Sequence, residues 1–145
     1  MYVNVGEMLK LKNMQHAKLV AGHYGIDRGI CGVNVLEATD ISNWGRSGEV
    51  ILTGLFALQD LNEAELANFF EKLFGIGISA VVVKIDRLVS HIPRQIIELC
   101  DKYSIPLIQI GADIKYEMII LEILGPIVHH NISLLNRYYE VHGEL

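Results

Sequence analysis

The run Ile78-Ser-Ala-Val-Val-Val-Lys84 constrains the fold of this chain more than any other segment. It is rich in β-branched residues and shows little alternation between apolar and polar side chains. A strand that faces water on one side alternates, whereas a strand covered on both faces reads as a nearly continuous apolar run. We therefore predict that residues 78–84 form an interior strand of a parallel sheet.

The segment before this strand carries the signals of a helix. Asn62 and Glu65 have the spacing of a capping box, which marks the first turn. Five apolar residues follow with the spacing of a buried helical face: Leu66, Phe69, Phe70, Leu73 and Phe74. The glycines after them, Gly75 and Gly77, are predicted to end the helix.

A second helix and another strand follow residues 78–84. Pro93 is typical of a helix start, and the apolar face of the helix that it opens includes Cys100. Residues 105–110 have the composition of a buried strand. Strands and helices that alternate at this spacing form right-handed crossovers between parallel strands.

The N-terminal part of the chain is predicted to be richer in strands. Asn4 and Glu7 have capping-box spacing, which predicts a short helix over residues 5–11. Three segments read as strands: residues 17–21, 33–38 and 49–53. The predicted fold class is therefore α/β, with a mostly parallel sheet, βαβ crossovers and a β-rich N-terminal portion.

Residues 116–141 are apolar on nearly all sides, apart from Gly125-Pro126, where we predict a break or kink. Such a helix packs on the sheet and a second protomer, or it continues into a linker helix. Residues on a heptad register form the predicted dimerisation stripe: Leu121, Leu124, Val128, Leu135 and Tyr138. We place the α/β domain in residues 1–125 and a C-terminal helical extension in residues 126–145.

The composition narrows the class of protein. Hydrophobic residues make up 51% of the chain, yet no apolar run approaches the roughly 20 residues that span a bilayer. The apolar excess instead fits a sheet covered on both faces and a surface hidden in an oligomer. The net charge of −5 argues against nucleic-acid binding by this segment. The N-terminus lacks a signal-peptide pattern, so we expect a cytoplasmic protein with no membrane partner.

The two cysteines, Cys31 and Cys100, lie far apart in sequence and lack the spacing of metal ligands. Both lie within apolar segments. We predict two buried free thiols, as is usual in a reducing cytoplasm.

Polar and charged residues between strands are candidate ligand-binding groups. Glu37 ends one predicted strand and Glu49 begins the next, and the loop between them holds Trp44, the only tryptophan, and Arg46. Carboxylates and a guanidinium around an aromatic ring would bind a planar, amide-rich molecule by stacking and paired hydrogen bonds. The alternative is that the charges are solvated and that Trp44 fills the core or a dimer interface.

A second polar group, which includes Lys84 and Arg87, lies at the C-terminal end of the strand over residues 78–84. Ligands of open α/β sheets bind beyond the C-terminal ends of the strands. The alternative is an ordinary loop with a local ion pair. The candidate ligand-binding residues are Glu37, Asp40, Trp44, Arg46, Glu49, Thr53, Lys84 and Arg87. Asp27 and Arg28 lie between two glycines, and we predict a structural role for that turn.

Neither metal binding nor catalysis is expected. The adjacent His129 and His130 point about 100° apart on a helix and cannot chelate one ion in the i, i+4 manner. No serine lies in a nucleophile-elbow context. We therefore predict a non-catalytic protein without a metal or another cofactor.

Several short segments match those of a family of bacterial regulators: Val5–Leu9, Ala21-Gly22, Gly25–Arg28, Val33-x-Val35-x-Glu37, Trp44, Gly48–Thr53 and Ile105–Leu107. On these segments the chain resembles the sensory N-terminal domain of PucR-type transcriptional regulators, named for the control of purine catabolism. The resemblance covers most of residues 1–125. It implies a sensor domain that binds a small metabolite and signals through a homodimer, with DNA binding located in another region.

The chain departs from the family pattern at two points. It has Thr53-Gly54-Leu55 where the family has two threonines and a glycine, and Gly32 where the family tends to carry an aromatic residue. A second hydroxyl and a stacking ring are therefore missing at these positions.

Two other functions are considered. A pure assembly module would use the apolar helix and Trp44 for dimerisation and would bind no small molecule. The Gly25–Gly29 turn also resembles the N-terminal domains of HPr kinase and of MurF-type ligases, an analogy of fold. A domain that recognises a nucleotide-sugar substrate ranks last, because no phosphate-binding loop is present.

Overall fold

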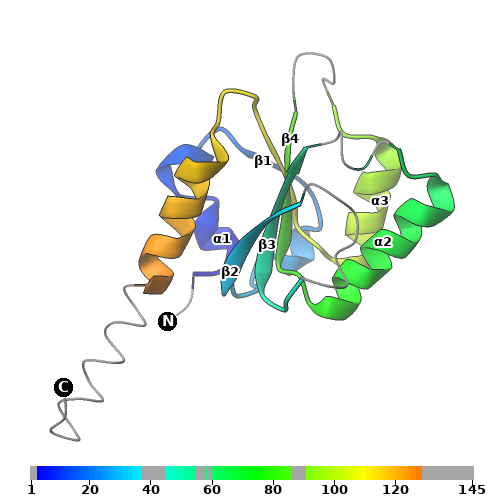
Figure 1. Ribbon diagram of the computed structural model, residues 1–145, viewed down its shortest axis with the longest axis horizontal. Coiled ribbons are helices and arrows are strands. Elements are labelled where there is room, and N and C mark those ends of the chain that lie inside the picture. Colours follow the sequence, from blue (N-terminus) through cyan, green and yellow to red (C-terminus); the bar gives the residue numbers. More distant parts are fainter. Residues whose placement is uncertain (1–2, 37–44, 55–57, 59, 86–90, 129–145) are drawn as a thin grey trace, which may run out of the picture.

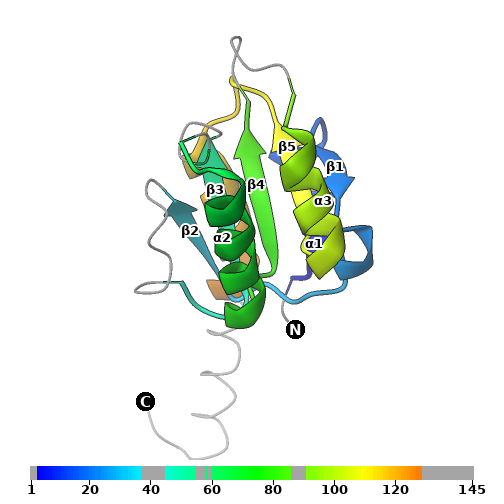
Figure 2. The same cartoon turned by 90° about the vertical axis from the view of Figure 1, so that its right-hand side faces the viewer.

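The described part of the chain, residues 3–36, 45–54, 58, 60–85 and 91–128 of the computed structural model, is built around one sheet. Its strand order is β1-β5-β4-β3-β2 (Figure 2). The strands are β1 (Lys18–Ala21), β2 (Gly32–Leu36), β3 (Glu49–Gly54), β4 (Ala80–Lys84) and β5 (Leu107–Ile110). Strands β2 to β5 pair in parallel, and β1 pairs with β5 in the antiparallel direction. The predicted α/β class with a mostly parallel sheet is confirmed.

Helices cover both faces of the sheet. They are α1 (Val5–Met8), α2 (Glu63–Ile76), α3 (Arg94–Tyr103) and a helix over residues 116–128, with 3₁₀ turns at Lys12–Met14 and His23–Gly25. Helices α2 and α3 lie on one face, and α1 and helix 116–128 lie on the other (Figure 1). The first helix is shorter than the predicted 5–11, because the chain turns into the 3₁₀ segment after Met8.

The strand residues alternate between two apolar clusters. Val81 and Val83 pack with α2 and α3, whereas Ala80 and Val82 pack with helix 116–128. All four side chains are buried. Since both faces are covered, the run has no polar face, which is why its sequence lacks alternation.

Helix α2 begins as predicted and ends two residues later than its first glycine suggests. Asn62 and Glu65 form both hydrogen bonds of the capping box. The helix continues through Gly75 and ends at Gly77, whose φ of 89° suits glycine. Phe74, predicted to be buried, is 49% exposed, because it lies at the border of the buried face, where its ring stacks on that of Tyr103.

The two cysteines differ in their surroundings. Cys100 is buried on α3, and burial, aided by the charge of Asp101, raises the pKa of its thiol far above the ordinary value. Cys31 is exposed, contrary to the prediction, because it lies in the turn before the edge strand β2. Both are free thiols, as predicted.

The Gly25–Gly29 turn has a structural role. The N–H groups of Val5 and Gly6, in the first turn of α1, donate to the carbonyls of Arg28 and Ile26. The guanidinium of Arg28 donates to the carbonyl of Ile78 at 3.0 Å and to that of Tyr103 at 3.2 Å. One side chain thereby joins the segments that lead into β4 and β5.

A break or kink was predicted at Gly125-Pro126, and helix 116–128 continues through this pair without a break. Ile119, Ile123 and Ile127 are buried against the sheet. A proline removes one helical hydrogen bond, and the buried isoleucines before and after it hold the helix on the sheet. The part of the predicted helix beyond residue 128 and the domain boundary at residue 125 stay predictions.

Candidate functional site

The sheet separates the residues that the sequence proposed as one ligand site. Glu49 begins β3, whereas Lys84 ends β4 and pairs with Gly54 at the end of β3. Five residues along a strand correspond to about 16 Å. Glu49 therefore lies at the amino ends of the parallel strands and Lys84 at their carboxyl ends, which we call the amino edge and the carboxyl edge of the sheet. The candidates Glu37, Asp40, Trp44 and Arg87 lie outside the described residues.

Glu49 accepts hydrogen bonds that stabilise the start of β3. One carboxylate oxygen accepts the backbone N–H of Arg46 at 2.7 Å and the side-chain amide of Asn34 at 3.3 Å. These bonds fasten the turn before β3 to the neighbouring strand β2. The side chain of Arg46 is exposed.

Thr53 is embedded in the sheet. Its side chain is only 1% exposed, and its hydroxyl lies 3.2 Å from the carbonyl oxygen of Leu36 and 3.1 Å from that of Gly54. The hydroxyl is therefore engaged within the sheet.

Lys84 contacts the start of the C-terminal helix. Its ammonium lies 4.4 Å from the centroid of the Tyr116 ring, a distance suited to a cation–π interaction. Burial raises the pKa of the Tyr116 phenol. Lys84 also pairs with Ile110 at the carboxyl end of β5. The sheet edge to which the sequence assigned Lys84 is therefore also the edge at which helix 116–128 begins.

A hollow of about 180 Å³ lies at this edge, beyond β5. Its lining combines an apolar floor with polar groups, from the 3₁₀ turn, the start of β1 and the segment after β5: Asn13, His16, Ala17, Ile110, Gly111, Asp113 and Ile114. Ile110 is buried, and the side chains of His16 and Asp113 are exposed. A hollow with these walls can hold a small molecule with both apolar and hydrogen-bonding groups.

One wall of this hollow is bonded to the C-terminal helix. The backbone N–H of Asn13 donates to Glu122 Oε1 at 2.9 Å, and the side-chain amide of Asn13 donates to the same oxygen. Asn13 and Glu122 are 109 residues apart in sequence. The 3₁₀ turn and helix 116–128 are therefore linked directly at the middle of the helix.

A wider hollow of about 400 Å³ lies at the opposite edge of the sheet, beside Arg28, Cys31, Ser47 and Ser79. Its polar groups are largely occupied, since Arg28 binds two carbonyls and the Ser79 hydroxyl donates to the carbonyl of Gly29. These side chains maintain the turn and leave little free hydrogen-bonding capacity.

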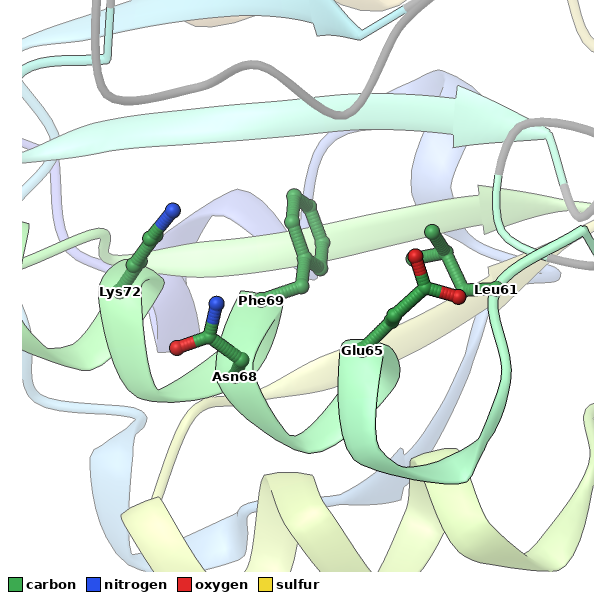
Figure 3. A pocket seen from close by; sticks show the side chains of 5 residues that line it. All are labelled: Leu61, Glu65, Asn68, Phe69 and Lys72. Carbon is green, nitrogen blue, oxygen red and sulfur yellow. The ribbon is translucent and has the colours of Figure 1, made fainter.

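A third hollow, of about 160 Å³, follows one side of α2. Figure 3 shows its lining: Leu61, Glu65, Asn68, Phe69 and Lys72. The carboxylate of Glu65 accepts from the N–H of Asn62 in the capping box. One of its polar side chains is therefore already engaged in the cap of α2.

The outer side of helix 116–128 carries an apolar stripe that is exposed in the isolated chain. Met118 is 45% exposed, Leu121 69% and Val128 51%. We call these three residues the outer stripe. Leu124, which the sequence placed in the dimerisation set, packs partly against the sheet. Leu135 and Tyr138 lie outside the described residues.

The described ranges contain no group of three or more His, Cys, Asp or Glu side chains placed to hold a metal ion. His129, His130 and His142 fall outside them. No helix within the described part of the chain is both long and apolar enough to cross a bilayer.

Several residues at the β5 edge were not selected from the sequence. Lys84 ends β4 and Asp113 lies shortly after the same end of β5, so the rule that selected Lys84 also applies to Asp113. His16 was not among the candidate ligand-binding residues. The pairing of Asn13 with Glu122 spans most of the chain and left no local pattern to detect.

Two comparisons place the chain among known proteins. The sequence model of the purine catabolism regulatory protein-like family matches residues 7–127. The purine catabolism regulatory protein of Bacillus subtilis (strain 168) is 28% identical to the chain over 131 residues. The alignment covers 90% of this chain and 23% of that relative, so the chain spans less than a quarter of the relative's length.

Proposed function

Because this chain belongs to the purine catabolism regulatory protein-like family, we propose that it is the sensor domain of a transcriptional regulator. It binds a small metabolite in the cytoplasm, performs no catalysis and signals through a homodimer. Binding of the operator is the task of another region, since the chain carries a net charge of −5. A purine-breakdown product is proposed as the metabolite because the relative is named for the regulation of purine catabolism.

The outer stripe is the observation that carries this proposal. Helix 116–128 buries one side on the sheet and leaves Met118, Leu121 and Val128 exposed on the other. An apolar stripe of this kind on a regulatory domain is suited to a second copy of the same helix. A metabolite then acts by favouring one of two arrangements of the helix pair, in proportion to its difference in affinity for them.

Dimerisation is tested by sedimentation equilibrium of the chain and of Leu121→Glu. Leu121 is 69% exposed, so its burial in a dimer contributes about 1–2 kcal/mol for each protomer. The substitution should raise the dimer dissociation constant at least about 30-fold. Tyr24→Glu is the matched control, because Tyr24 is 94% exposed and lies in a 3₁₀ turn away from this helix. A chain that stays monomeric at all concentrations contradicts the proposal.

Metabolite binding is tested by thermal-shift titration with urate, allantoin, allantoate, ureidoglycolate and xanthine, with uridine nucleotides for comparison. A compound at about 100 times its dissociation constant adds about 2.7 kcal/mol to the free energy of unfolding, or several degrees in Tm. A flat response to the whole panel, together with dimerisation through the outer stripe, would support the alternative function of a pure assembly module.

A further inference from the structure

The three hollows differ in their contacts with helix 116–128, the element that would carry a signal to a second protomer. The hollow beside Arg28 lies at the amino edge of the parallel strands, and the one along α2 lies over an outer helix. Only the hollow beyond β5, among these three, has walls that lead into or bond to helix 116–128. It also lies at the carboxyl edge of the sheet, next to the antiparallel strand β1, and ligands of open α/β sheets bind at that edge.

The lining of this hollow selects the charge of its occupant. Asp113 contributes a carboxylate to the lining. A second carboxylate, that of Glu122, accepts a hydrogen bond from the lining residue Asn13. Its described lining residues include no lysine or arginine. An anionic group would be repelled by the Asp113 carboxylate, whereas N–H groups of a neutral ligand can donate to it. His16 and Asn13 supply further hydrogen-bonding groups.

The size of the hollow limits its occupant as well. A volume of about 180 Å³ corresponds to roughly six water molecules and is below the usual range for larger ligands. Ile110, Ala17 and Ile114 provide apolar contact for one ring. A single-ring molecule fits this space, and a nucleotide does not.

The same walls connect the hollow to the outer stripe. Residues 111–114 lead directly into the helix that begins at residue 116. Asn13, on the other side, bonds to Glu122, which is one residue from Leu121 on the helix. A molecule that separates or draws together these two walls therefore changes how helix 116–128 is held.

We propose that the hollow lined by Asn13, His16, Ala17, Ile110, Asp113 and Ile114 is the effector site. It takes a small uncharged molecule that carries N–H donors and carbonyl acceptors, and the Asn13–Glu122 bond transmits its binding to the dimer helix. The assignment rests on the proposed sensor function and deepens it. Glu122 is a positioning residue, because it acts on the occupant only through Asn13.

The experiment uses allantoin, which is uncharged, and allantoate, its ring-opened anion, as a matched pair of probes on the whole chain. Allantoin should raise Tm, and allantoate should not. Ala17→Leu fills the floor and should abolish the shift, whereas Ala64→Leu, on the exposed side of α2, should keep it. Asp113→Asn, which alters no apolar contact, should weaken allantoin binding at least about tenfold, and Asp60→Asn should not.

Transmission is tested with Glu122→Ala, with Glu117→Ala on the same helix as its control. Glu122→Ala should still bind allantoin, but allantoin should no longer change the dimer dissociation constant. Glu117 is exposed, and its substitution should leave both properties unchanged.

The possible outcomes distinguish failure of the proposed site from failure of the proposed sensor function. Allantoin binding that survives both Ala17→Leu and Asp113→Asn overturns the site and leaves the sensor function standing. A stronger response to allantoate than to allantoin overturns the uncharged class. A wild-type chain that responds to neither probe nor to the rest of the panel overturns the sensor function, and the site with it.

Discussion

Removal of the Arg28 side chain should destabilise the domain strongly. Its guanidinium donates to two carbonyls, of Ile78 and of Tyr103, that precede β4 and β5. A hydrogen bond from a charged donor contributes about 1.5–3 kcal/mol, and we take the lower end for this partly buried side chain. Arg28→Ala should therefore lower the free energy of unfolding by about 3 kcal/mol.

Urea denaturation followed by circular dichroism measures this loss. For a domain of this size, 3 kcal/mol lowers the urea midpoint by roughly 1.5–2 M and Tm by roughly 10 °C. Arg28→Lys keeps the charge but lacks the planar fork that reaches both carbonyls, so it should recover at most about half of the loss.

The control is Arg94→Ala. Arg94 forms an ion pair with Glu98 at 3.0 Å, but their side chains are 90% and 64% exposed. Loss of such a pair costs at most about 1 kcal/mol. The reasoning is refuted if Arg28→Ala is no more destabilising than Arg94→Ala, or if Arg28→Lys is as stable as the wild type.

Three further predictions concern single residues. A thiol reagent should modify Cys31 in the native protein and Cys100 only after unfolding, which mass spectrometry can count; equal rates for both would contradict the burial of Cys100. Asn62→Ala should cost about 1 kcal/mol in urea denaturation by removing the α2 cap, and the exposed Asn68→Ala on the same helix should cost clearly less. Burial raises the pKa of Tyr116 above its ordinary 10.0, so the neutral phenol favours the fold. This stability is present below about pH 10 and is lost as the pH rises further, so the wild type should lose more stability than Tyr116→Phe between pH 8 and 11; equal losses would exclude the effect.

The sequence correctly predicted the parts of the fold that depend on residues close together in the chain. The capping box of Asn62 and Glu65 involves residues three apart, and it set the start of α2 correctly. The continuous apolar run before Lys84 predicted a strand covered on both faces, because burial on each side acts on each residue directly.

The errors arose where packing between distant segments decided the outcome. Cys31 is apolar and was predicted to be buried, but its turn lies at the edge of the sheet. A break or kink was predicted at Gly125-Pro126, but the helix does not break there, and Ile123 and Ile127 are buried against the sheet on both sides of the pair. Phe74 was assigned to the buried face of α2, although it lies at the border of that face.

The candidate site shows the same limit. Glu49 at the start of one predicted strand and Lys84 at the end of another were both candidate ligand-binding residues, and the parallel register of β3 and β4 separates them by the length of a strand. The link between Asn13 and Glu122 joins opposite ends of the chain. Only the three-dimensional arrangement brings these two residues together.

The central claim is that a small molecule beyond β5 controls the pairing of helix 116–128. Its most direct test is the dimer dissociation constant of the wild-type chain, measured by sedimentation equilibrium without allantoin and with allantoin at saturation. Coupled sites typically change each other's equilibria about 5–150-fold, so we expect a change of at least about fivefold. The same dissociation constant with and without bound allantoin would contradict the claim.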